Sequence, residues 1–131
     1  MSQKKRGCDA ERELLHLLND RGFAVARIAG SGIETFCDLL AGNGKKRYAI
    51  EVKIASGNKK YLNKQQIIGL IKFANKFGVA PIVAIKFLRK GWWFVRPEKL
   101  SCTKKAFIIS FEEAQKKGES LNDFCESKIL K

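Results

Sequence analysis

The amino-acid sequence predicts a single α/β domain with a central mixed β-sheet flanked by helices. A strand that contains Glu51, a helix over 63–77 and a buried strand over 81–87 are expected to follow one another, the order of a right-handed βαβ unit with parallel strands. The hairpin signal Asn43-Gly44 precedes the first of these strands and predicts an antiparallel neighbour for it. The chain has 131 residues, is 45% apolar and contains no low-complexity linker, so we expect one domain over residues 1–131.

The first helix is predicted from leucines at helical spacing between Asp9, a suitable N-cap, and Gly22, a C-terminal stop. Glu11 precedes Leu14 by three residues and Leu18 by seven, so it projects from the apolar face toward the sheet. Arg12, Glu13 and His16 are expected to project away from it. A carboxylate on a core-facing stripe is costly unless it is paired or binds a metal.

The middle of the chain supplies the remaining elements of the main sheet. We expect a strand over 23–28 and a second helix that Asn63 caps, with Gln66 completing a capping box and Gly78 ending the helix. A buried strand over 81–87 follows this helix.

The last third of the chain is less regular. Residues 92–95 are predicted to form the hairpin neighbour of strand 81–87, and 107–109 to form an edge strand. Ser110 and Glu113 form a capping-box pattern that begins a short helix. Residues 121–124 have two interpretations, a closing element or a turn that frays.

Two acids lie on the strands on either side of the predicted turn. A two-residue turn at Asn43-Gly44 places Asp38 opposite Ala49, so Asp38 and Glu51 share a face as diagonal neighbours. Such pairs have Cα atoms about 7–8 Å apart, which lets two carboxylates hold one cation. A slip of one residue would move Asp38 to the opposite face.

Glu51 is the only acid between Leu39 and Pro97, a stretch with thirteen Lys or Arg residues. Hard cations such as Mg²⁺ prefer oxygen ligands, which Asp38 and Glu51 supply. The simplest partner for the Glu11 carboxylate is the site that these two residues form. Lys53, on the same strand face, could orient or deprotonate a metal-bound water and neutralise charge on phosphorus. The sequence therefore predicts metal-dependent phosphodiester hydrolysis.

Four motifs carry a resemblance to a known family. The chain resembles the PD-(D/E)XK nuclease superfamily and, within it, archaeal Holliday junction resolvases of the Hjc type, through Arg6-Gly7-x-x-x-Glu11-Arg12-Glu13-Leu14, Arg27-x-Ala29-Gly30-Ser31-Gly32, Asp38-Leu39-Leu40-Ala41-Gly42-Asn43-Gly44 and Ile50-Glu51-Val52-Lys53. The similarity covers roughly the first three quarters of the chain. Cys37 stands where the superfamily name leads one to expect proline, and nothing in the metal chemistry requires proline there.

The resemblance implies a restriction-endonuclease-like fold and an enzyme that resolves four-way DNA junctions by paired nicks in homologous recombination. It implies a homodimer that uses Mg²⁺, which Mn²⁺ can replace. It also implies a role for Ser31 on a mobile loop and DNA contacts by Arg12 and Arg27. The implied active site consists of Glu11, Asp38, Glu51 and Lys53, the first three as metal ligands.

The formal net charge is +13, and nearly all the excess lies in the middle of the chain. A solvated lysine-rich surface is one interpretation, but the position of the charge around the predicted site favours a long polyanion, nucleic acid. Lys59 and Lys60, in an expected basic loop over 56–60, and Lys64 at the start of the second helix are the candidate DNA contacts beside Arg27.

Several alternatives stay open at this stage. Phe73 and Phe77 share one helix stripe, which suits either core packing or the dimer contact that the resemblance favours. Another repair or restriction-type endonuclease, or a non-catalytic nucleic-acid-binding module of the same fold, would share most of these features. The four cysteines lack zinc-site spacing. No apolar run has the length of a membrane span, and we expect a cytoplasmic protein without membrane contact.

Overall fold

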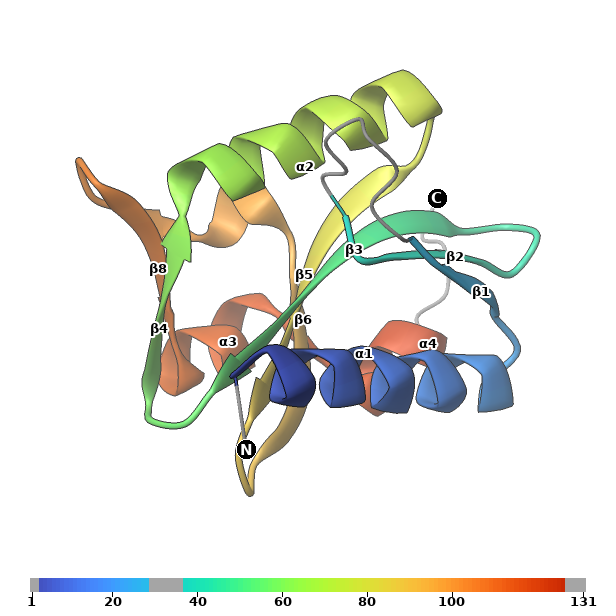
Figure 1. Ribbon diagram of the computed structural model, residues 1–131, viewed down its shortest axis with the longest axis horizontal. Helices are drawn as coiled ribbons and strands as arrows, with labels where there is room; N and C mark the ends of the chain where they lie inside the picture. The colour runs from blue at the N-terminus through green and yellow to red at the C-terminus, as the bar shows by residue number, and fades with distance from the viewer. Residues whose placement is uncertain (1–2, 29–36, 127–131) are drawn as a thin grey trace.

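A six-stranded mixed sheet forms the centre of the computed structural model, which describes residues 3–28 and 37–126 (Figure 1). Its strand order is β1-β2-β3-β5-β6-β9. The strands are β1 (Ala24–Arg27), β2 (Leu39–Gly42), β3 (Arg47–Ala55), β5 (Ala80–Phe87), β6 (Gly91–Val95) and β9 (Glu119–Ser120). Strands β3 and β5 are parallel and every other neighbouring pair is antiparallel, which confirms the predicted mixed sheet.

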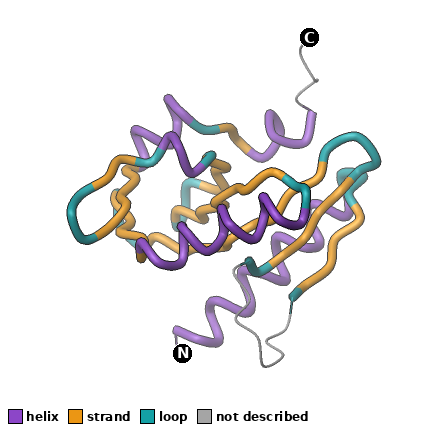
Figure 2. Tube along the Cα trace, turned by 90° about the horizontal axis from the view of Figure 1, so that it is seen from above, coloured by secondary structure: helices purple, strands orange, loops and turns teal. Residues whose placement is uncertain are grey.

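Helices cover both faces of this sheet, as Figures 1 and 2 show. Helix α1 (Gln3–Asp20) packs Leu14 and Leu18, both fully buried, against one face together with α4 (Leu121–Glu126). Helix α2 (Lys64–Phe77) packs Ile67 and Leu70 against the other face together with α3 (Phe111–Lys117). The apolar residues of β3 alternate between these two cores, as expected for a strand covered on both sides.

A second, three-stranded sheet was not predicted. Its order is β4-β8-β7, with β4 (Lys59–Asn63), β8 (Ala106–Ser110) and β7 (Ser101–Cys102), and the 3-10 helix η1 (Pro97–Lys99) precedes β7. The expected basic loop over 56–60 is therefore wrong for Lys59 and Lys60, and 107–109 lies in a central strand of this sheet. The pairing buries Leu62 and Ile109 together, a contact between segments too far apart in sequence for local patterns to reveal.

Helix ends follow the predicted signals in part. Helix α1 begins at Gln3, so Asp9 lies inside the helix and is not its N-cap. Gly78 ends α2 in the left-handed conformation, with φ of 90° that favours glycine. Ser110 and Glu113 form the predicted capping box of α3. Helix α4 closes the core, because Phe124 is 1% exposed and its ring stacks on Phe94 with centroids 4.1 Å apart.

The turn between β2 and β3 differs from the predicted one by two residues. The Asn43 side chain accepts hydrogen bonds from the amides of Lys45, at 2.9 Å, and Lys46, at 2.7 Å, which closes a four-residue loop. Leu40 therefore pairs with Ala49 and not with Arg47. A shift of two residues keeps every side chain on its face, so the inference that Asp38 and Glu51 converge survives the wrong register.

No helix in the described part of the chain is long and apolar enough to cross a membrane. The four cysteines are all free thiols.

Candidate active site

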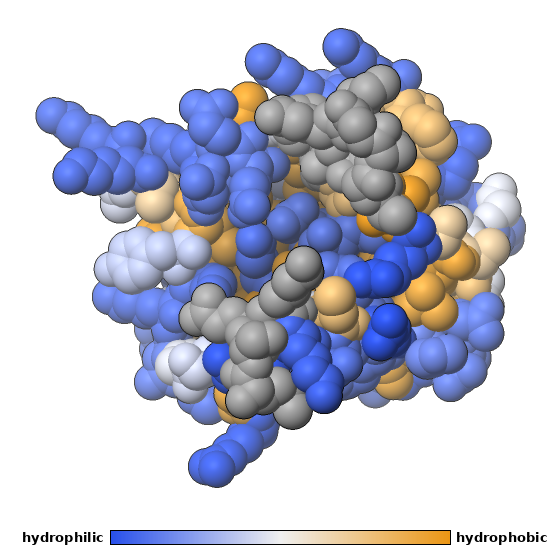
Figure 3. Space-filling model, in the orientation of Figure 1, coloured by the Kyte–Doolittle hydropathy of each residue, from blue (hydrophilic) through white to orange (hydrophobic). Residues whose placement is uncertain are grey.

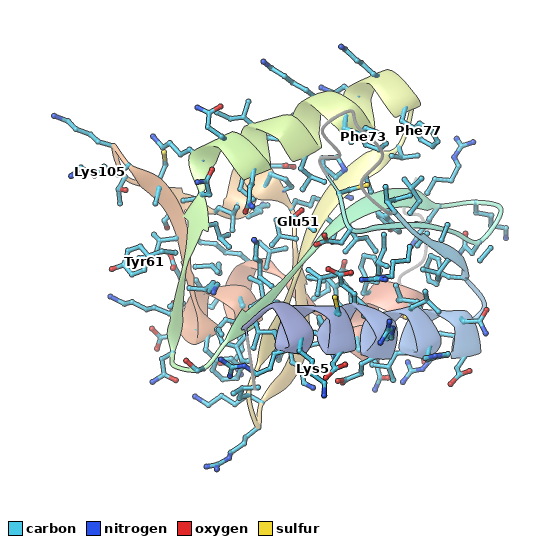
Figure 4. All side chains as sticks on the ribbon, viewed as in Figure 1. Lys5, Glu51, Tyr61, Phe73, Phe77 and Lys105 are labelled. Atoms are coloured by element: carbon cyan, nitrogen blue, oxygen red, sulfur yellow. The ribbon has the colours of Figure 1, made fainter. Side chains whose placement is uncertain are left out.

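The candidate site lies where β2 and β3 separate. Strand β2 pairs with β3 as far as Leu39 opposite Ile50, whereas β3 continues beside β5 to Ala55. On its β2 side, the stretch of β3 after Ile50 lines a cavity of about 520 Å³. In Figure 4, Glu51 lies at the centre of the molecule, between α1 and α2. The lining residues come from α1, β3, β4 and α2 and from the positions just before β2 and just after β3: Arg6, Gly7, Cys8, Glu11, Asp38, Glu51, Val52, Lys53, Ile54, Ser56, Lys60 and Gln66.

Asp38 is fixed by the open edge of β3. Its Oδ2 accepts a hydrogen bond of 2.8 Å from the Val52 amide, one of the amides that β2 no longer pairs. Burial raises the pKa of Asp38 to about 6, with a contribution from the neighbouring Glu11 carboxylate that the Val52 hydrogen bond partly offsets. The carboxylate is thus held in place by the backbone, and the charge of Lys53 also favours its ionised form.

Glu51 is the only charged residue that is buried in the described part of the chain, at 8% exposed. Burial and repulsion from Asp38 raise the pKa of Glu51 to about 7, and the neighbouring Lys53 opposes this shift. Two carboxyl groups with raised pKa values in one cavity are typical of a site that receives a cation or transfers a proton.

Lys53 is held at the same cavity by two partners. Its Nζ lies 3.2 Å from Glu51 Oε2 and donates a hydrogen bond of 2.8 Å to Gln66 Oε1. The predicted cap of α2 is present, because Asn63 accepts from the Gln66 amide at 3.1 Å. The predicted capping box is wrong, since the Gln66 side chain binds Lys53 in place of the Asn63 backbone. Sequence reasoning therefore missed Gln66 as a residue that positions Lys53.

Glu11 reaches the cavity from α1, as predicted, and forms an ion pair there. Arg27 Nε donates to Glu11 Oε1 at 2.8 Å, and Glu11 holds the pKa of Arg27 above its ordinary value. Arg27 also donates to Cys8 Sγ at 3.2 Å. The expected DNA contact Arg27 is thus a partner of the expected metal ligand Glu11.

Glu13, on the same helix, does not project away from the protein as expected. Its carboxylate accepts hydrogen bonds from Lys86 Nζ and from Trp92 Nε1, the latter at 3.0 Å. These contacts attach α1 to β5 and β6. The spacing of polar and apolar residues along the helix did not indicate them.

The other expected DNA contacts lie at different depths. Lys60 lines the cavity, and burial together with the charge of Lys53 lowers its pKa. Lys59 and Arg12 are exposed, and Lys64 Nζ lies over the Phe107 ring at 6.0 Å. Ser31 lies outside the described residues.

The cavity presents two carboxylates that could bind a metal ion. Asp38 and Glu51 offer oxygen ligands, and a cation between them would relieve the repulsion from Asp38 that, after burial, contributes to the raised pKa of Glu51. Among the described residues, however, no three Asp, Glu, His or Cys side chains already form a set that could hold a metal ion. Asp38 and Glu51 therefore fit a metal ion as a pair of ligands. The Glu11 carboxylate is ion-paired with Arg27, so its role as a metal ligand stays a prediction.

Phe73 and Phe77 stack on each other at the end of α2, with centroids 5.4 Å apart (Figure 4). Phe73 packs against the core beneath α2, whereas Phe77 is 59% exposed. Phe77 also borders a second, largely apolar cavity of about 330 Å³ that residues of β1, β2 and β3 line. Core packing thus accounts for Phe73 but not for Phe77.

The mixed sheet, with the buried Glu51, the half-buried Asp38 and a lysine at the point where two strands separate, is the architecture of a restriction-endonuclease-like nuclease. The model of the family described as archaeal Holliday junction resolvase (Hjc) matches residues 2–130. The crossover junction endodeoxyribonuclease Hjc of Archaeoglobus fulgidus is 43% identical over 108 residues, which cover 81% of this chain and 79% of that protein. The Methanocaldococcus jannaschii Hjc is 42% identical over 106 residues, 80% of this chain and 76% of that protein.

The solved structure of the A. fulgidus Hjc, described as a Holliday junction resolvase from an archaeal hyperthermophile, superimposes with a TM-score of 0.83. The match has 36% sequence identity and covers 91% of this chain and 99% of the A. fulgidus chain. This chain belongs to the archaeal Holliday junction resolvase (Hjc) family.

Proposed function

We propose that this chain is a Mg²⁺-dependent endonuclease that resolves four-way DNA junctions by paired nicks during homologous recombination. The observation that carries the proposal is the convergence of Asp38, Glu51 and Lys53 on one cavity in a chain of this family. A chromosomal substrate of this kind would place the enzyme in the cytoplasm.

The chain's own residues account for most of the chemistry. Asp38 and Glu51 would hold the ion, which when bound lowers the pKa of a water ligand and polarises a phosphoryl oxygen. Lys53 Nζ, oriented by Gln66, would hydrogen-bond the attacking water or the scissile phosphate and stabilise the negative charge that develops there. Lys60, on the wall of the cavity, would add positive charge toward the same phosphate.

The proposal is tested by incubating the protein with Mg²⁺ and three labelled DNAs: a four-way junction, a plain duplex and a single strand. We expect symmetric nicks in the junction and far slower cleavage of the other two, with Mn²⁺ replacing Mg²⁺ and excess chelator stopping the reaction. Equal cleavage of duplex and junction would favour a repair or restriction-type endonuclease instead. Junction binding without cleavage in either metal would leave a binding module and overturn the proposal.

We further propose that the enzyme acts as a homodimer through the end of α2. The described part of each chain has one candidate site, whereas paired nicks require two sites related by symmetry. The exposed Phe77 ring beside an apolar cavity is a surface that a second copy of the chain could bury. Arg47 at the border of that cavity supplies a charged group of the kind that the polar rim of an interface contains.

Replacing Phe73 and Phe77 together with Ala should lower the mass in solution from dimer to monomer, because truncating a well-packed interface aromatic costs roughly 3–5 kcal/mol. Phe77→Ala alone is the cleaner variant, since Phe73 also packs against the core of its own chain. Leu88→Ala, which truncates a 39% exposed leucine in the β5–β6 turn, is the control and should leave the mass unchanged. Light scattering that shows a monomeric wild type making paired nicks would contradict the dimer mechanism.

A further inference from the structure

The small sheet β4-β8-β7 concentrates positive charge beside the active site. Residues 59–64 and 99–110, which form this sheet, its turn, the end of η1 and the first residue of α2, contain six lysines and no carboxylate. We call this part of the molecule the basic wing. In Figure 3 the end of the molecule that carries β4 and β8 in Figure 1 shows predominantly hydrophilic side chains that extend outward. The lysines are Lys59, Lys60, Lys64, Lys99, Lys104 and Lys105.

The strand β4 connects the active-site cavity to the outer face of the wing. Successive side chains of a strand point to opposite faces. Lys60 and Leu62 therefore point inward, where Lys60 lines the cavity and Leu62 is 1% exposed. Lys59 and Tyr61 point outward, and Figure 4 shows Tyr61 directed away from Glu51 at the edge of the molecule. A substrate bound at the cavity thus meets the wing as the next surface.

Tyr61 is the most exposed large hydrophobic residue of the described chain, at 63%. It pairs across the sheet with the half-buried Ile108, which in turn pairs with Ser101, so the outer face carries a small apolar strip among lysines. An aromatic ring with a hydroxyl at its tip can pack against a sugar and donate to a phosphate oxygen.

The turn between β7 and β8 holds its two lysines outward in a fixed backbone conformation. Thr103 N donates to Ala106 O at 2.8 Å, and Thr103 Oγ1 accepts from the amides of Ala106, at 3.0 Å, and Lys105, at 3.3 Å. Lys104 and Lys105 are both exposed, and Lys105 marks the tip of the turn in Figure 4. Two ammonium groups on a hydrogen-bonded turn suit contacts with successive phosphates of one strand.

We propose that the basic wing binds a duplex arm of the DNA substrate beyond the cleaved phosphate. In this arrangement Lys104 and Lys105 contact backbone phosphates and Tyr61 packs against a deoxyribose. The inference rests on the proposed function for the identity of the substrate. An acidic protein would also match the charge, but the continuity of β4 from the cavity to Tyr61 favours the molecule that the cavity itself binds.

Hydroxyl-radical footprinting on a four-way junction, with chelator present to prevent cleavage, tests the proposal. The wild type should protect sugars at the crossover and a second group of sugars further along an arm. Lys104→Gln with Lys105→Gln, and separately Tyr61→Ala, should remove only the second group. For the double variant, the plot of log affinity against log salt should be less steep than that of the wild type by about 1.8. Between about 50 and about 200 mM salt, the variant should therefore lose roughly tenfold less affinity than the wild type.

The control is Lys45→Gln with Arg89→Gln, which removes two positive charges from exposed turns elsewhere and should leave both groups of protected sugars intact. A wild type without distal protection, or variants with unchanged footprint and salt slope, would overturn the proposal and leave an acidic protein as the occupant of the wing. Loss of both protected groups in variants that melt like the wild type would overturn it too. Cleavage in Mg²⁺ is measured separately, so a failure of the proposed function is recognised independently of these results.

Discussion

Glu51→Gln and Asp38→Asn should each lower the rate of junction cleavage in Mg²⁺ by at least about 10²–10³-fold while leaving junction binding intact or tighter. Each change removes one anionic oxygen ligand from the candidate ion site and hardly alters side-chain volume. Binding is retained because the lysines around the cavity are untouched, and it gains because a carboxylate that repels the scissile phosphate is gone. The measurement is single-turnover cleavage together with an affinity measured in chelator.

Glu112→Gln is the matched control, since it makes the same chemical change at an exposed position on α3. The control should cleave and bind like the wild type. Near wild-type nicking by Glu51→Gln or Asp38→Asn in Mg²⁺ would remove the metal-site model, because the cavity would then work without one of the two carboxylates that line it.

The same two substitutions should stabilise the metal-free protein above about pH 7. The ordinary pKa values of 3.8 for Asp38 and 4.5 for Glu51 rise in the folded protein to about 6 and about 7. The folded state therefore holds protons that the unfolded chain releases, so the contribution of this pair to stability is fully present below about pH 4 and is lost as the pH rises through 6 and 7. Each pKa unit corresponds to about 1.4 kcal/mol, which makes the loss roughly 3 kcal/mol per group at most.

Denaturant unfolding with chelator at several pH values checks this prediction. The difference in free energy of unfolding between Glu51→Gln and the wild type should grow between about pH 5 and about pH 8, and Glu112→Gln should show no such trend. Adding Mg²⁺ at pH 8 should stabilise the wild type more than Glu51→Gln, because binding to the folded state adds to its stability. A pH-independent difference would mean that Asp38 and Glu51 are solvated well enough to ionise at their ordinary pKa values.

Local sequence patterns predicted the elements that depend on contacts between near neighbours. The parallel strands around α2, the Asn63 and Ser110 caps and the stop at Gly78 were all predicted correctly, because the residues involved lie within a few positions of each other. The beginning of α1 was wrong because Asp9 has the character of a cap but continues a helix that starts at Gln3.

The second sheet lay beyond the reach of such patterns. Its strands β4 and β8 are separated by more than forty residues, and their pairing depends on the shared burial of Leu62 and Ile109. Lys59 and Lys60 were assigned to a loop because their lysine-rich segment has no apolar alternation of its own. The surface that we propose for a DNA arm is therefore a product of tertiary pairing.

The sequence by itself determined the chemical identity of the site. The alternation of strand residues puts Asp38, Glu51 and Lys53 on one face, and an error of two residues in the predicted turn does not change that face. Only the tertiary structure decided how that face becomes a cavity. Strand β2 begins at Leu39, opposite Ile50, so the stretch of β3 beyond Ile50 has no partner in β2. This leaves the Val52 amide for Asp38 and lets residues of α1 and α2 reach the same space from opposite faces of the sheet. The partners of Lys53 and Glu11, which are Gln66 and Arg27, follow from this packing, because hydrogen bonds between distant segments form only after the layers are assembled.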